Sequence, residues 1–451
     1  MTHHSGLPND MPKGALTSEP PSTLINRLKD EYVAYPTNYV LAYSNVAMAL
    51  LGLMVAQVSD TEFSEYTDQS IFASIGMPQS SFELTPAIKS LLSTGYRNGK
   101  EIKQVHLRYV AAGSMYSNVL DLARFIQMIF AKGQVGNRQI LQPDTIDEML
   151  RPQNEAIALD FEQRIGLGWV LIYAGKAKEK IATHAGNMPL FHTTIAILPE
   201  KKIGVVVLTN SAEGRRIYDK IAGAALKLAI AAKTGNSIEK REYKITPPDK
   251  IASEEMLQEF VGKYATINML GSVERNKKML KAQVGGYKFQ LIPSSDGSFG
   301  VGRKWLGIFS LKKMGDLELA SIRARRMDLA GRELLILRYD GRHWFTAEKI
   351  DPLPLPDAWE NALGKYQVTN PDPGSSIQDV TLSRKEDLLV LTYKFPVWGG
   401  GKRILYFASI SETEAITQGI GRNSGETMRI VNLDNEKGLY FMGFKMKKNP
   451  S

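Results

Sequence analysis

The sequence predicts an α+β domain followed by two small antiparallel β-barrels. Apolar residues recur with helical spacing up to about residue 150, and they alternate with a period of two between residues 166 and 210. Beyond a charged segment at 236–256 that contains Pro247 and Pro248, they occur almost only in short alternating runs. Helices followed by a segregated sheet are typical of an α+β domain. We therefore predict domains at 1–240, 257–352 and 353–451, with a linker at 241–256.

Composition limits the class of protein. A chain of 451 residues with 43% hydrophobic and 23% charged residues is long enough for two or three domains with ordinary cores. No apolar run approaches the roughly 18 to 20 residues that span a bilayer, so we expect no membrane span. The formal net charge is +9, but lysines and arginines are scattered, which indicates a solvated basic surface and no nucleic-acid site. The absence of cysteine excludes disulfides, thiolate metal ligands and a cysteine nucleophile.

The helical part of the chain has clear start and stop signals. We expect an N-cap at Asn118 and a helix stop at Gly76 and Pro78. A polar loop is expected at 87–106, and Ser22 is a candidate cap for the first helix. The expected helices lie at 21–34, 43–58, 119–126 and 142–150.

The period then changes to two, which predicts an antiparallel meander. The turn at Pro199 joins its last two strands, and a helix at 215–232 closes the domain. The expected strands lie at 166–172, 180–186, 191–198 and 204–210.

The rest of the chain contains an internal repeat about a hundred residues long. A Gly-Lys-Tyr sequence follows a short amphipathic helix twice, first after 254–260 and again after 357–362. Two copies of an antiparallel unit of this length favour two barrels over one sandwich. The matching segments are Val261-Gly262-Lys263-Tyr264 and Leu363-Gly364-Lys365-Tyr366.

Tyr43-Ser44-Asn45 is the first candidate for chemistry. It places a phenol and a carboxamide at the head of an apolar helix, where a proton-transfer group and a substrate-holding amide would be useful. An isolated Tyr-x-Asn is more often a helix cap, so the motif needs support from other segments.

Several other segments, all in one order over residues 3–210, provide that support. Together they resemble the serine β-lactamase and penicillin-binding-protein superfamily, in particular its class C β-lactamase-like branch of esterases and D-aminopeptidases. Tyr43-Ser44-Asn45 is similar to the Y-x-N motif of this branch. The other matching segments are His4-Ser5-Gly6-Leu7-Pro8 (H-T-S-G-L-P), 72–77 ("PLGM"), 113–125 (GG-x-Y-S-T-x-x-D-L-A-R-F), 166–169, His184-Ala185-Gly186 and 205–210.

The third motif of the family is K-T-G, or H-x-G in the esterase and D-aminopeptidase branch. His184-Ala185-Gly186 matches it on a predicted strand. The literal Lys233-Thr234-Gly235 stands where a helix is expected to end, and a motif on that element would not line the cleft. We also expect a structural role for the second Tyr-x-Asn, at 116–118.

The resemblance implies a role for each matching residue. Tyr43 would be the general base, and Asn45 would hold the amide of the substrate. His184 would lie near the leaving group or the substrate carboxylate. Ser44 and Gly186 would border the substrate, and the N–H of Asn187 would join the oxyanion hole.

The family nucleophile is the serine of S-x-x-K, roughly fifty residues before the turn that matches His4. The only S-x-x-K strings in this sequence start at Ser237 and Ser310, and neither precedes the Tyr43 helix. We assign no nucleophile and expect the chain to be truncated before this motif. The expected function is that of a serine hydrolase acting on amide, D-amino-acid peptide, lactam or ester bonds through an acyl-enzyme. The alternative is an inactive homologue, or a β-barrel binding protein that retains a ligand pocket.

The partners follow from the same resemblance. In D-aminopeptidases such barrels lie near the cleft and restrict access, which implies a small-molecule or short-peptide substrate. No Asp, Glu or His spacing indicates a metal site, and no glycine-rich loop indicates a nucleotide, so we expect no cofactor. The sequence does not decide whether the chain forms a homo-oligomer. It does not decide the compartment either, which would be periplasmic or secreted with an upstream signal and cytoplasmic otherwise.

Overall fold

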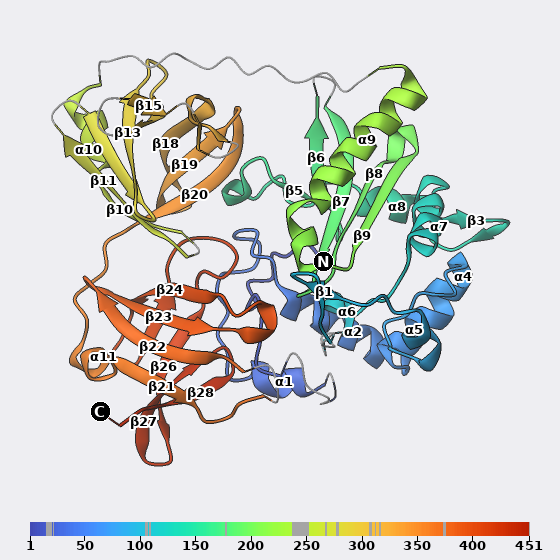
Figure 1. Cartoon of the computed structure of the whole chain (residues 1–451), viewed down its shortest axis with the longest axis horizontal. Helices are drawn as coiled ribbons and strands as arrows, with labels where there is room; N and C mark the ends of the chain where they lie inside the picture. Colours follow the sequence, from blue (N-terminus) through green and yellow to red (C-terminus); the bar gives the residue numbers. More distant parts are fainter. Residues whose placement is uncertain are drawn as a thin grey trace.

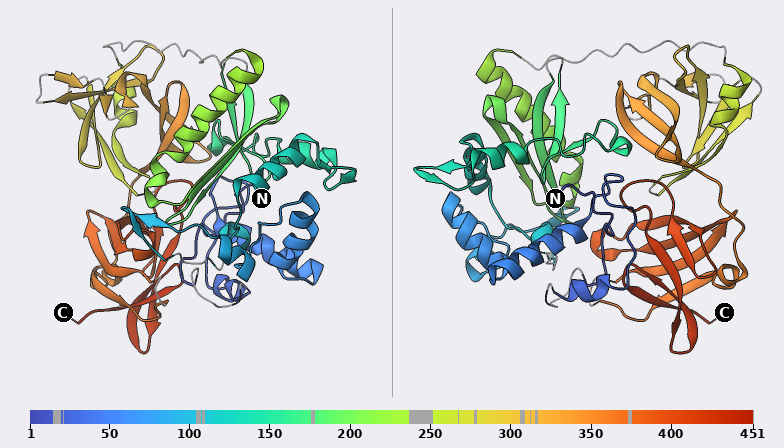
Figure 2. Two further views of the ribbon diagram at one scale, coloured as in Figure 1. Left: turned by 45° about the vertical axis from the view of Figure 1, so that its right-hand side comes forward. Right: turned by 180° about the vertical axis from the view of Figure 1, so that it is seen from behind.

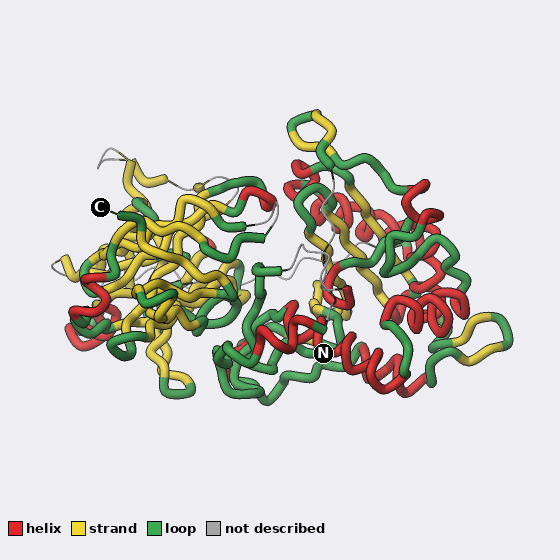
Figure 3. The backbone as a smooth tube through the Cα atoms, turned by 90° about the horizontal axis from the view of Figure 1, so that it is seen from below, coloured by secondary structure: helices red, strands yellow, loops and turns green. Residues whose placement is uncertain are grey.

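The computed structural model describes residues 1–14, 20, 22–103, 107, 110–175, 178–236, 252–266, 268–276, 279–305, 309–311, 313–314, 317–372 and 376–450. It has a first part of helices around one sheet and two barrels beside it (Figure 1). Seen from below, the strand-rich barrels lie on one side and most of the helices on the other (Figure 3). The expected α+β domain and the two expected barrels are confirmed.

Most of the helices expected in the first part are present. Asn118 caps α7, since its Oδ1 accepts hydrogen bonds from the N–H groups of Leu120 (2.9 Å) and Asp121 (3.0 Å). Gly76, with a φ of 78°, ends α4 in the left-handed conformation. The helices and helical turns are α1 (Thr23–Leu28), α2 (Asn45–Ser59), α3 (Phe63–Thr67), η1 (Asp68–Phe72), α4 (Ala73–Ile75), α5 (Pro86–Leu91), α6 (Val110–Gly113), α7 (Val119–Phe130), α8 (Pro143–Met149), η2 (Ala158–Asp160), η3 (Pro199–Lys201), η4 (Ala212–Arg216) and α9 (Tyr218–Thr234).

The polar loop expected at 87–106 is wrong where a helix and a hairpin stand, and residues 104–106 of it lie outside the described residues. Thr85 caps α5 and Pro86 occupies its first turn, which is a regular helix-start signal. The dipeptide Asn98-Gly99, with φ values of 51° and 71°, then turns the hairpin of β1 (Tyr96–Arg97) and β2 (Lys100–Glu101). Such Asn-Gly turns match the twist of a hairpin.

The helix expected at 21–34 is also wrong in its extent, because α1 ends at Leu28 and Ser22 makes no side-chain cap. The backbone that follows bonds instead to the N-terminal segment. Ala34 N–H donates to the Gly6 carbonyl at 2.7 Å, and Ala42 N–H donates to the His3 carbonyl at 3.0 Å. These partners are distant in sequence, so no local pattern indicates them.

The sheet of the first part is the expected antiparallel meander. Its strands pair in chain order: β5 (Arg164–Ile165), β6 (Val170–Ala174), β7 (Glu179–Asn187), β8 (His192–Leu198) and β9 (Ile203–Thr209). Helix α9 crosses one face of this sheet (Figure 2), where Leu226 and Ile230 pack on Leu198. Helix α7 covers the other face through Ile126 and Ile129. A separate short hairpin pairs β3 (Gln134–Val135) with β4 (Arg138–Gln139).

The first barrel follows α10 (Glu254–Phe260). Strands β10–β14 and β18–β20 close into a ring, because β14 pairs with both β13 and β18 and β20 returns to β10. Its strands are β10 (Gly262–Ala265), β11 (Leu270–Asn276), β12 (Met279–Val284), β13 (Tyr287–Pro293), β14 (Phe299–Trp305), β18 (Ile322–Leu329), β19 (Arg332–Tyr339) and β20 (Arg342–Ile350), with β15 (Phe309–Leu311), β16 (Lys313–Met314), β17 (Leu317–Glu318) and η5 (Leu319–Ser321) between β14 and β18.

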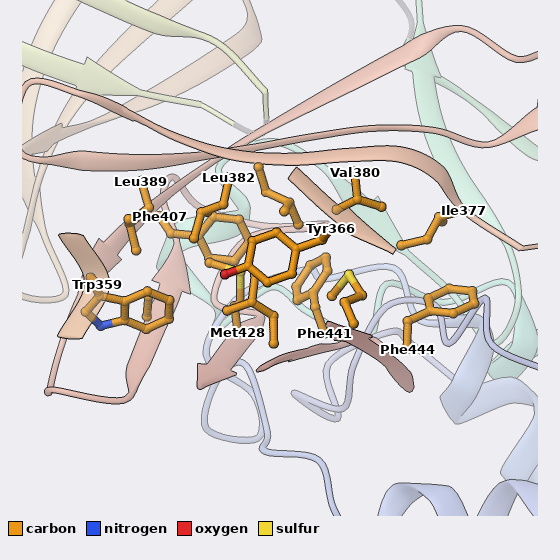
Figure 4. Packing of buried hydrophobic residues seen from close by; sticks show 14 residues of the cluster. Trp359, Tyr366, Ile377, Val380, Leu382, Leu389, Phe407, Met428, Phe441 and Phe444 are labelled. Carbon is orange, nitrogen blue, oxygen red and sulfur yellow. The ribbon is translucent and has the colours of Figure 1, made fainter. Parts of the chain in front are cut away.

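The second barrel follows α11 (Asp357–Asn361) and is closed by the pairing of its first and last strands. Its interior is filled with side chains, among them Phe407, Met428 and Phe441 (Figure 4). Trp359 is fully buried at its edge and donates from Nε1 to the Ser411 carbonyl at 3.0 Å. The strands are β21 (Gly364–Val368), β22 (Gln378–Lys385), β23 (Leu388–Lys394), β24 (Lys402–Ser409), β25 (Glu414–Thr417), β26 (Thr427–Leu433), β27 (Glu436–Phe441) and β28 (Phe444–Lys448), with η6 (Pro396–Trp398) between β23 and β24.

The repeated Gly-Lys-Tyr sequence adopts the same conformation and makes the same hydrogen bond in both barrels. Gly262 and Gly364 have φ values of 155° and 151°, a region that side chains with a Cβ rarely adopt. The hydroxyl of Tyr264 donates to the Phe260 carbonyl, and that of Tyr366 donates to the Ala362 carbonyl. Each tyrosine therefore closes the end of the short helix four residues before it.

The N-terminal segment lies between the first domain and the barrels. Tyr35, Val40 and Ala42 pack on Leu334 and Ile336 of the first barrel.

Residues 241–251 of the expected linker lie outside the described residues, and the domain boundaries stay predictions. No single helix in the described ranges is long and apolar enough to cross a membrane, although the bent pair Asn45–Ser59 and Phe63–Ile75 passes by length and composition.

Candidate active site

Ser44 fixes the place where α2 begins. Its hydroxyl accepts a hydrogen bond from Ala47 N–H at 2.9 Å and donates to the Pro8 carbonyl at 2.6 Å. Its backbone N–H donates to Nδ1 of His3 at 3.2 Å. The side chain is fully buried, so the structure places Ser44 in the scaffold of the motif and leaves Tyr43 and Asn45 on either side of it.

Tyr43 is surrounded by groups from three distant segments. The ring of His3 stacks on it with centroids 3.8 Å apart, and the His184 ring lies 6.4 Å away. The guanidinium carbon of Arg422, from the second barrel, lies 4.8 Å from the Tyr43 ring centroid. The fold thus brings together Tyr43 and His184, which the sequence predicted as parts of one site.

Burial sets the protonation of this cluster. It raises the pKa of Tyr43, while the nearby Arg422 cation lowers it to a smaller extent. Burial also lowers the pKa of His184, and it lowers the pKa of His3 to about 4. At neutral pH the cluster therefore contains a protonated phenol and two uncharged imidazoles.

Asn45 belongs to a polar chain that reaches the second barrel. Its Nδ2 donates to Asp10 Oδ1 at 2.6 Å, and Asp10 Oδ2 pairs with Nη2 of Arg422 at 3.0 Å. The backbone N–H of Asn45 donates to the Asn9 carbonyl at 2.8 Å. The carboxamide is therefore oriented by a carboxylate that also holds Arg422.

The end of β7 presents an open strand edge next to His184. In the described part of the sheet, β6 pairs with β7 only as far as Thr183, whereas β8 continues to Asn187. Gly186 and Asn187 are exposed. A Cβ on Gly186 would lie 2.6 Å from Thr193 Oγ1, so a side chain at this position would collide with Thr193 on the neighbouring strand. Free backbone groups at such an edge can bind an extended ligand.

The Asn187 side chain contacts two others, those of His192 and Tyr218. Its Oδ1 lies 2.9 Å from Nδ1 of His192, and its Nδ2 donates to the Tyr218 hydroxyl at 3.2 Å. His192 is buried at the start of β8. The exposed backbone of Asn187 is thus fixed from the side of the core.

Comparison with known proteins identifies the first domain. The family model described as "Beta-lactamase" matches residues 1–228. The chain belongs to the β-lactamase family.

Among curated relatives of this β-lactamase-family chain, the "Putative beta-lactamase-like 1" of Homo sapiens is 24% identical over 187 residues, 41% of this chain and 36% of the relative. The "D-alanyl-D-alanine-carboxypeptidase/endopeptidase AmpH" of Escherichia coli K12 is 26% identical over 223 residues, 47% of this chain and 57% of the relative. This chain thus spans less than two thirds of either relative. The octameric penicillin-binding protein homologue from Pyrococcus abyssi is a similar solved structure, with a TM-score of 0.45, 21% identity and coverage of 77% and 76% of the two chains.

Three residues of this β-lactamase-family site escaped the sequence analysis. None of the three residues, His3, Asp10 and Arg422, was selected as a site residue. Asp10 and Arg422 could not have been found from spacing, because they come from a turn and from a barrel loop and meet only in the folded chain. The stacking of His3 on Tyr43 likewise depends on the pairing of residues 3–9 with residues 34–45.

The competing motifs lie on other elements. Lys233 and Thr234 end α9, which confirms that the Lys233-Thr234-Gly235 string stands at a helix end, and its lack of a role in the site stays a prediction. Asn118 caps α7, as expected for 116–118. Ser310 lies in β15 of the first barrel, and Ser237 lies outside the described residues.

Neither a metal site nor a pocket accompanies the cluster around Tyr43 in the described part of this β-lactamase-family chain. Within the residues that the structure describes, no group of three or more His, Asp or Glu side chains is placed to hold a metal ion. A shallow pocket of about 550 Å³ lies between α4 and α7, lined by Asp68, Met77 and Arg124 among others. It contains none of the residues around Tyr43.

Proposed function

We propose that this chain provides the substrate-binding and proton-transfer part of a serine-hydrolase site of the β-lactamase type, acting on a small amide, D-amino-acid peptide, lactam or ester. The proximity of the Tyr43 and His184 rings, 6.4 Å apart beside an open strand edge, is the observation that supports it. A proton-transfer group and backbone donors at one place are what acyl transfer requires.

Each group has a role in this proposal. The backbone N–H groups at the open end of β7, Asn187 among them, bind the developing oxyanion. Asn45 holds the amide of the substrate, and its own orientation comes from Asp10. Tyr43, protonated at neutral pH, is the proton donor to the leaving group. His184, uncharged at the same pH, accepts a hydrogen bond from the substrate. Ser44 serves as the helix cap.

The attacking group is left unassigned. In the described residues, no S-x-x-K string stands beside Tyr43, and this observation favours a second candidate: binding of the same ligands without turnover. The barrels are the weaker place for a ligand, because the described side chains of each barrel pack into a buried apolar cluster. The ligand-carrying role considered for the barrels is therefore disfavoured.

The test uses the full chain and three chromogenic substrates: nitrocefin, p-nitrophenyl acetate and D-alanine p-nitroanilide. Tyr43→Phe removes only the hydroxyl, and Tyr173→Phe, at an exposed position of β6, is the matched control. We expect turnover that falls by about 100-fold or more in Tyr43→Phe, the usual size of a lost proton-transfer group, and is unchanged in the control.

Mass spectrometry of the chain after incubation with a fluorescent penicillin locates any acylated serine. Turnover that Tyr43→Phe leaves intact would remove Tyr43 from the mechanism. Binding without turnover or acylation would establish the second candidate, and the absence of both binding and turnover would overturn the proposal.

A further inference from the structure

The pocket of about 550 Å³ between α4 and α7 lies on the side of the first domain away from the barrels (Figure 1). This volume is in the range usual for sites that bind small molecules. Its lining combines apolar side chains, among them Met77 and Pro78, with one acidic and one basic residue, Asp68 and Arg124. None of these residues takes part in the proposed function, so the pocket is a separate place for a ligand.

Asp68 places on the wall of this pocket a carboxylate that forms no ion pair within the described part of the chain. Its Oδ2 accepts a hydrogen bond from Ser81 Oγ at 2.9 Å. Its Oδ1 is buried, and none of the described residues donates a hydrogen bond to it. Burial raises the pKa of Asp68, and the bond from Ser81 opposes that rise. A cationic donor of a ligand would compensate this carboxylate.

The backbone at this wall is irregular. The π-helical turn η1 begins at Asp68, whose carbonyl accepts a hydrogen bond from Ala73 N–H five residues later. Turns of this kind are rare and occur frequently at functional sites. Gly76 follows with a φ of 78°, and a Cβ on it would have one neighbour within 4 Å among the described atoms, Arg124 Cδ at 3.8 Å. The glycine therefore leaves space beside Arg124.

Arg124 provides the positive charge of the pocket. Its Nη1 donates to the Gly76 carbonyl and to Asp121 Oδ1, the latter at 3.3 Å. Asp121 is buried and is itself held by Gln79 N–H at 2.8 Å and by Ser80 Oγ at 2.9 Å. These bonds fix the guanidinium through one of its three nitrogens, and the side chain is 49% exposed. The other N–H groups of the planar fork can bind a carboxylate.

We propose that this pocket is a second binding site, for a small zwitterion of the free amino-acid type. The ammonium group of the ligand binds the Asp68 carboxylate, its carboxylate binds the Arg124 guanidinium, and a short apolar side chain lies against Met77 and Pro78. A ligand with a single charge would leave either Asp68 or Arg124 without a counter-charge. The site shares no residue with the cluster around Tyr43.

The test titrates the full chain with the two enantiomers of alanine and with two derivatives of each, the N-acetyl acid, which lacks the ammonium group, and the amide, which lacks the carboxylate. Isothermal titration calorimetry measures each Kd. We expect at least one enantiomer of alanine to bind about tenfold or more tightly than either of its derivatives, since a hydrogen bond to a charged group is usually worth that factor. This comparison uses the wild type alone and does not depend on how any variant folds.

Two variants then locate the site. Asp68→Asn keeps the acceptor for Ser81 and should weaken alanine by about tenfold or more while removing its advantage over the N-acetyl acid. Arg124→Gln should remove the advantage over the amide. The matched controls are Asp144→Asn and Arg138→Gln, at exposed positions of α8 and β4, which should change no Kd. Equal Tm values show that the variants remain folded.

Three results would overturn the proposal. The first is no binding of either enantiomer up to about 10 mM, and the second is equal affinity for alanine and its singly charged derivatives. The third is alanine binding that survives in Asp68→Asn and is lost in Tyr43→Phe, which would place the amino acid at the cluster around Tyr43. Each of them leaves the proposed function standing, because that function is tested by turnover and acylation.

Discussion

Asn9 of the first domain and Glu426 of the second barrel are joined by two hydrogen bonds to a single oxygen. The backbone N–H and the Nδ2 of Asn9 both donate to Glu426 Oε1, and both residues are buried. Asn9 directly precedes Asp10, and Glu426 closes the loop that carries Arg422. This contact therefore determines how a barrel residue is placed beside Tyr43.

Asn9→Ala should undock the loop. The change removes two of the three hydrogen bonds between Asn9 and the loop: the half-buried N–H of Asn423 loses its acceptor, and Glu426 Oε1 keeps one donor in place of two. A hydrogen bond contributes about 0.5 to 1.5 kcal/mol, or about 1.5 to 3 kcal/mol when one partner is charged, so we expect the free energy of unfolding to fall by about 2 to 4 kcal/mol. Denaturation with urea measures this change. Hydrogen exchange should rise in residues 418–426, whereas the exposed Asn432→Ala should change neither quantity. A loop equally protected in Asn9→Ala would contradict the anchoring role.

Glu426 should make this interface sensitive to pH. Burial raises its pKa from 4.5 to about 7, and the hydrogen bonds from Asn9 offset the effect only in part. The folded state therefore holds a proton that the unfolded state releases above pH 4.5. Stability is highest at low pH in this range and falls as the pH rises from about 4.5 to about 7, by up to about 3 kcal/mol.

Glu426→Gln, which keeps the acceptor and cannot ionise, should remove this fall. The measurement is the difference in free energy of unfolding between wild type and variant, followed from pH 5 to 8. Glu436→Gln, an exposed pair partner of Lys447, serves as the control. A difference that stays constant over this range would show that Glu426 does not titrate there.

Tyr43 should titrate above the ordinary tyrosine pKa of 10.0. Burial raises its pKa, and the Arg422 cation opposes that rise. The ultraviolet absorbance of tyrosinate, taken as wild type minus Tyr43→Phe, isolates this phenol from the other tyrosines. In Arg422→Gln the same difference curve should move to still higher pH. A curve centred below pH 10.0 in the wild type would mean that Tyr43 is available as a base, as the family resemblance first implied.

The sequence predicted the parts of the fold that depend on local pattern. The meander over β5–β9 follows from alternation, and α7 follows from its cap at Asn118 and its apolar stripe. The repeated Gly-Lys-Tyr sequence predicted two units of one kind, and in the structure each copy closes a short helix with a tyrosine hydroxyl. The hairpin at Asn98-Gly99 was missed although its turn signal is in the sequence.

The candidate site could be predicted only in part, for a physical reason. Tyr43 and His184 stand in motifs, so their residue types and order are informative. His3 and Asp10 reach Tyr43 through backbone pairing between segments tens of residues apart, and Arg422 reaches it through the docking of a loop that lies hundreds of residues away in the sequence. Arg422 in particular lies in a loop whose glycines serve contacts with Thr266 and Ala34. Its position depends on how the domains pack against each other, and no periodic pattern in the sequence indicates it.

Asp160 should be needed for the position of Tyr43. Its carboxylate is fully buried and accepts hydrogen bonds from Leu41 N–H at 2.6 Å, from His4 Nε2 at 2.7 Å and from Asn154 Nδ2. Leu41 lies two residues before Tyr43, and His4 follows the histidine that stacks on it. Asp160→Asn keeps the size of the side chain and replaces one acceptor oxygen by a donor, which would face another donor.

We expect Asp160→Asn to lower the free energy of unfolding by about 2 to 4 kcal/mol and to weaken ligand binding, because the segment that carries Tyr43 loses its support. Urea denaturation measures the first effect, and titration with N-acetyl-D-alanyl-D-alanine measures the second at a temperature where the variant stays folded. Asp144→Asn, in the exposed first turn of α8, should affect neither. Full stability together with weakened binding would indicate that Asp160 acts on the ligand itself. Unchanged values of both would show that the His4 network is dispensable for the site.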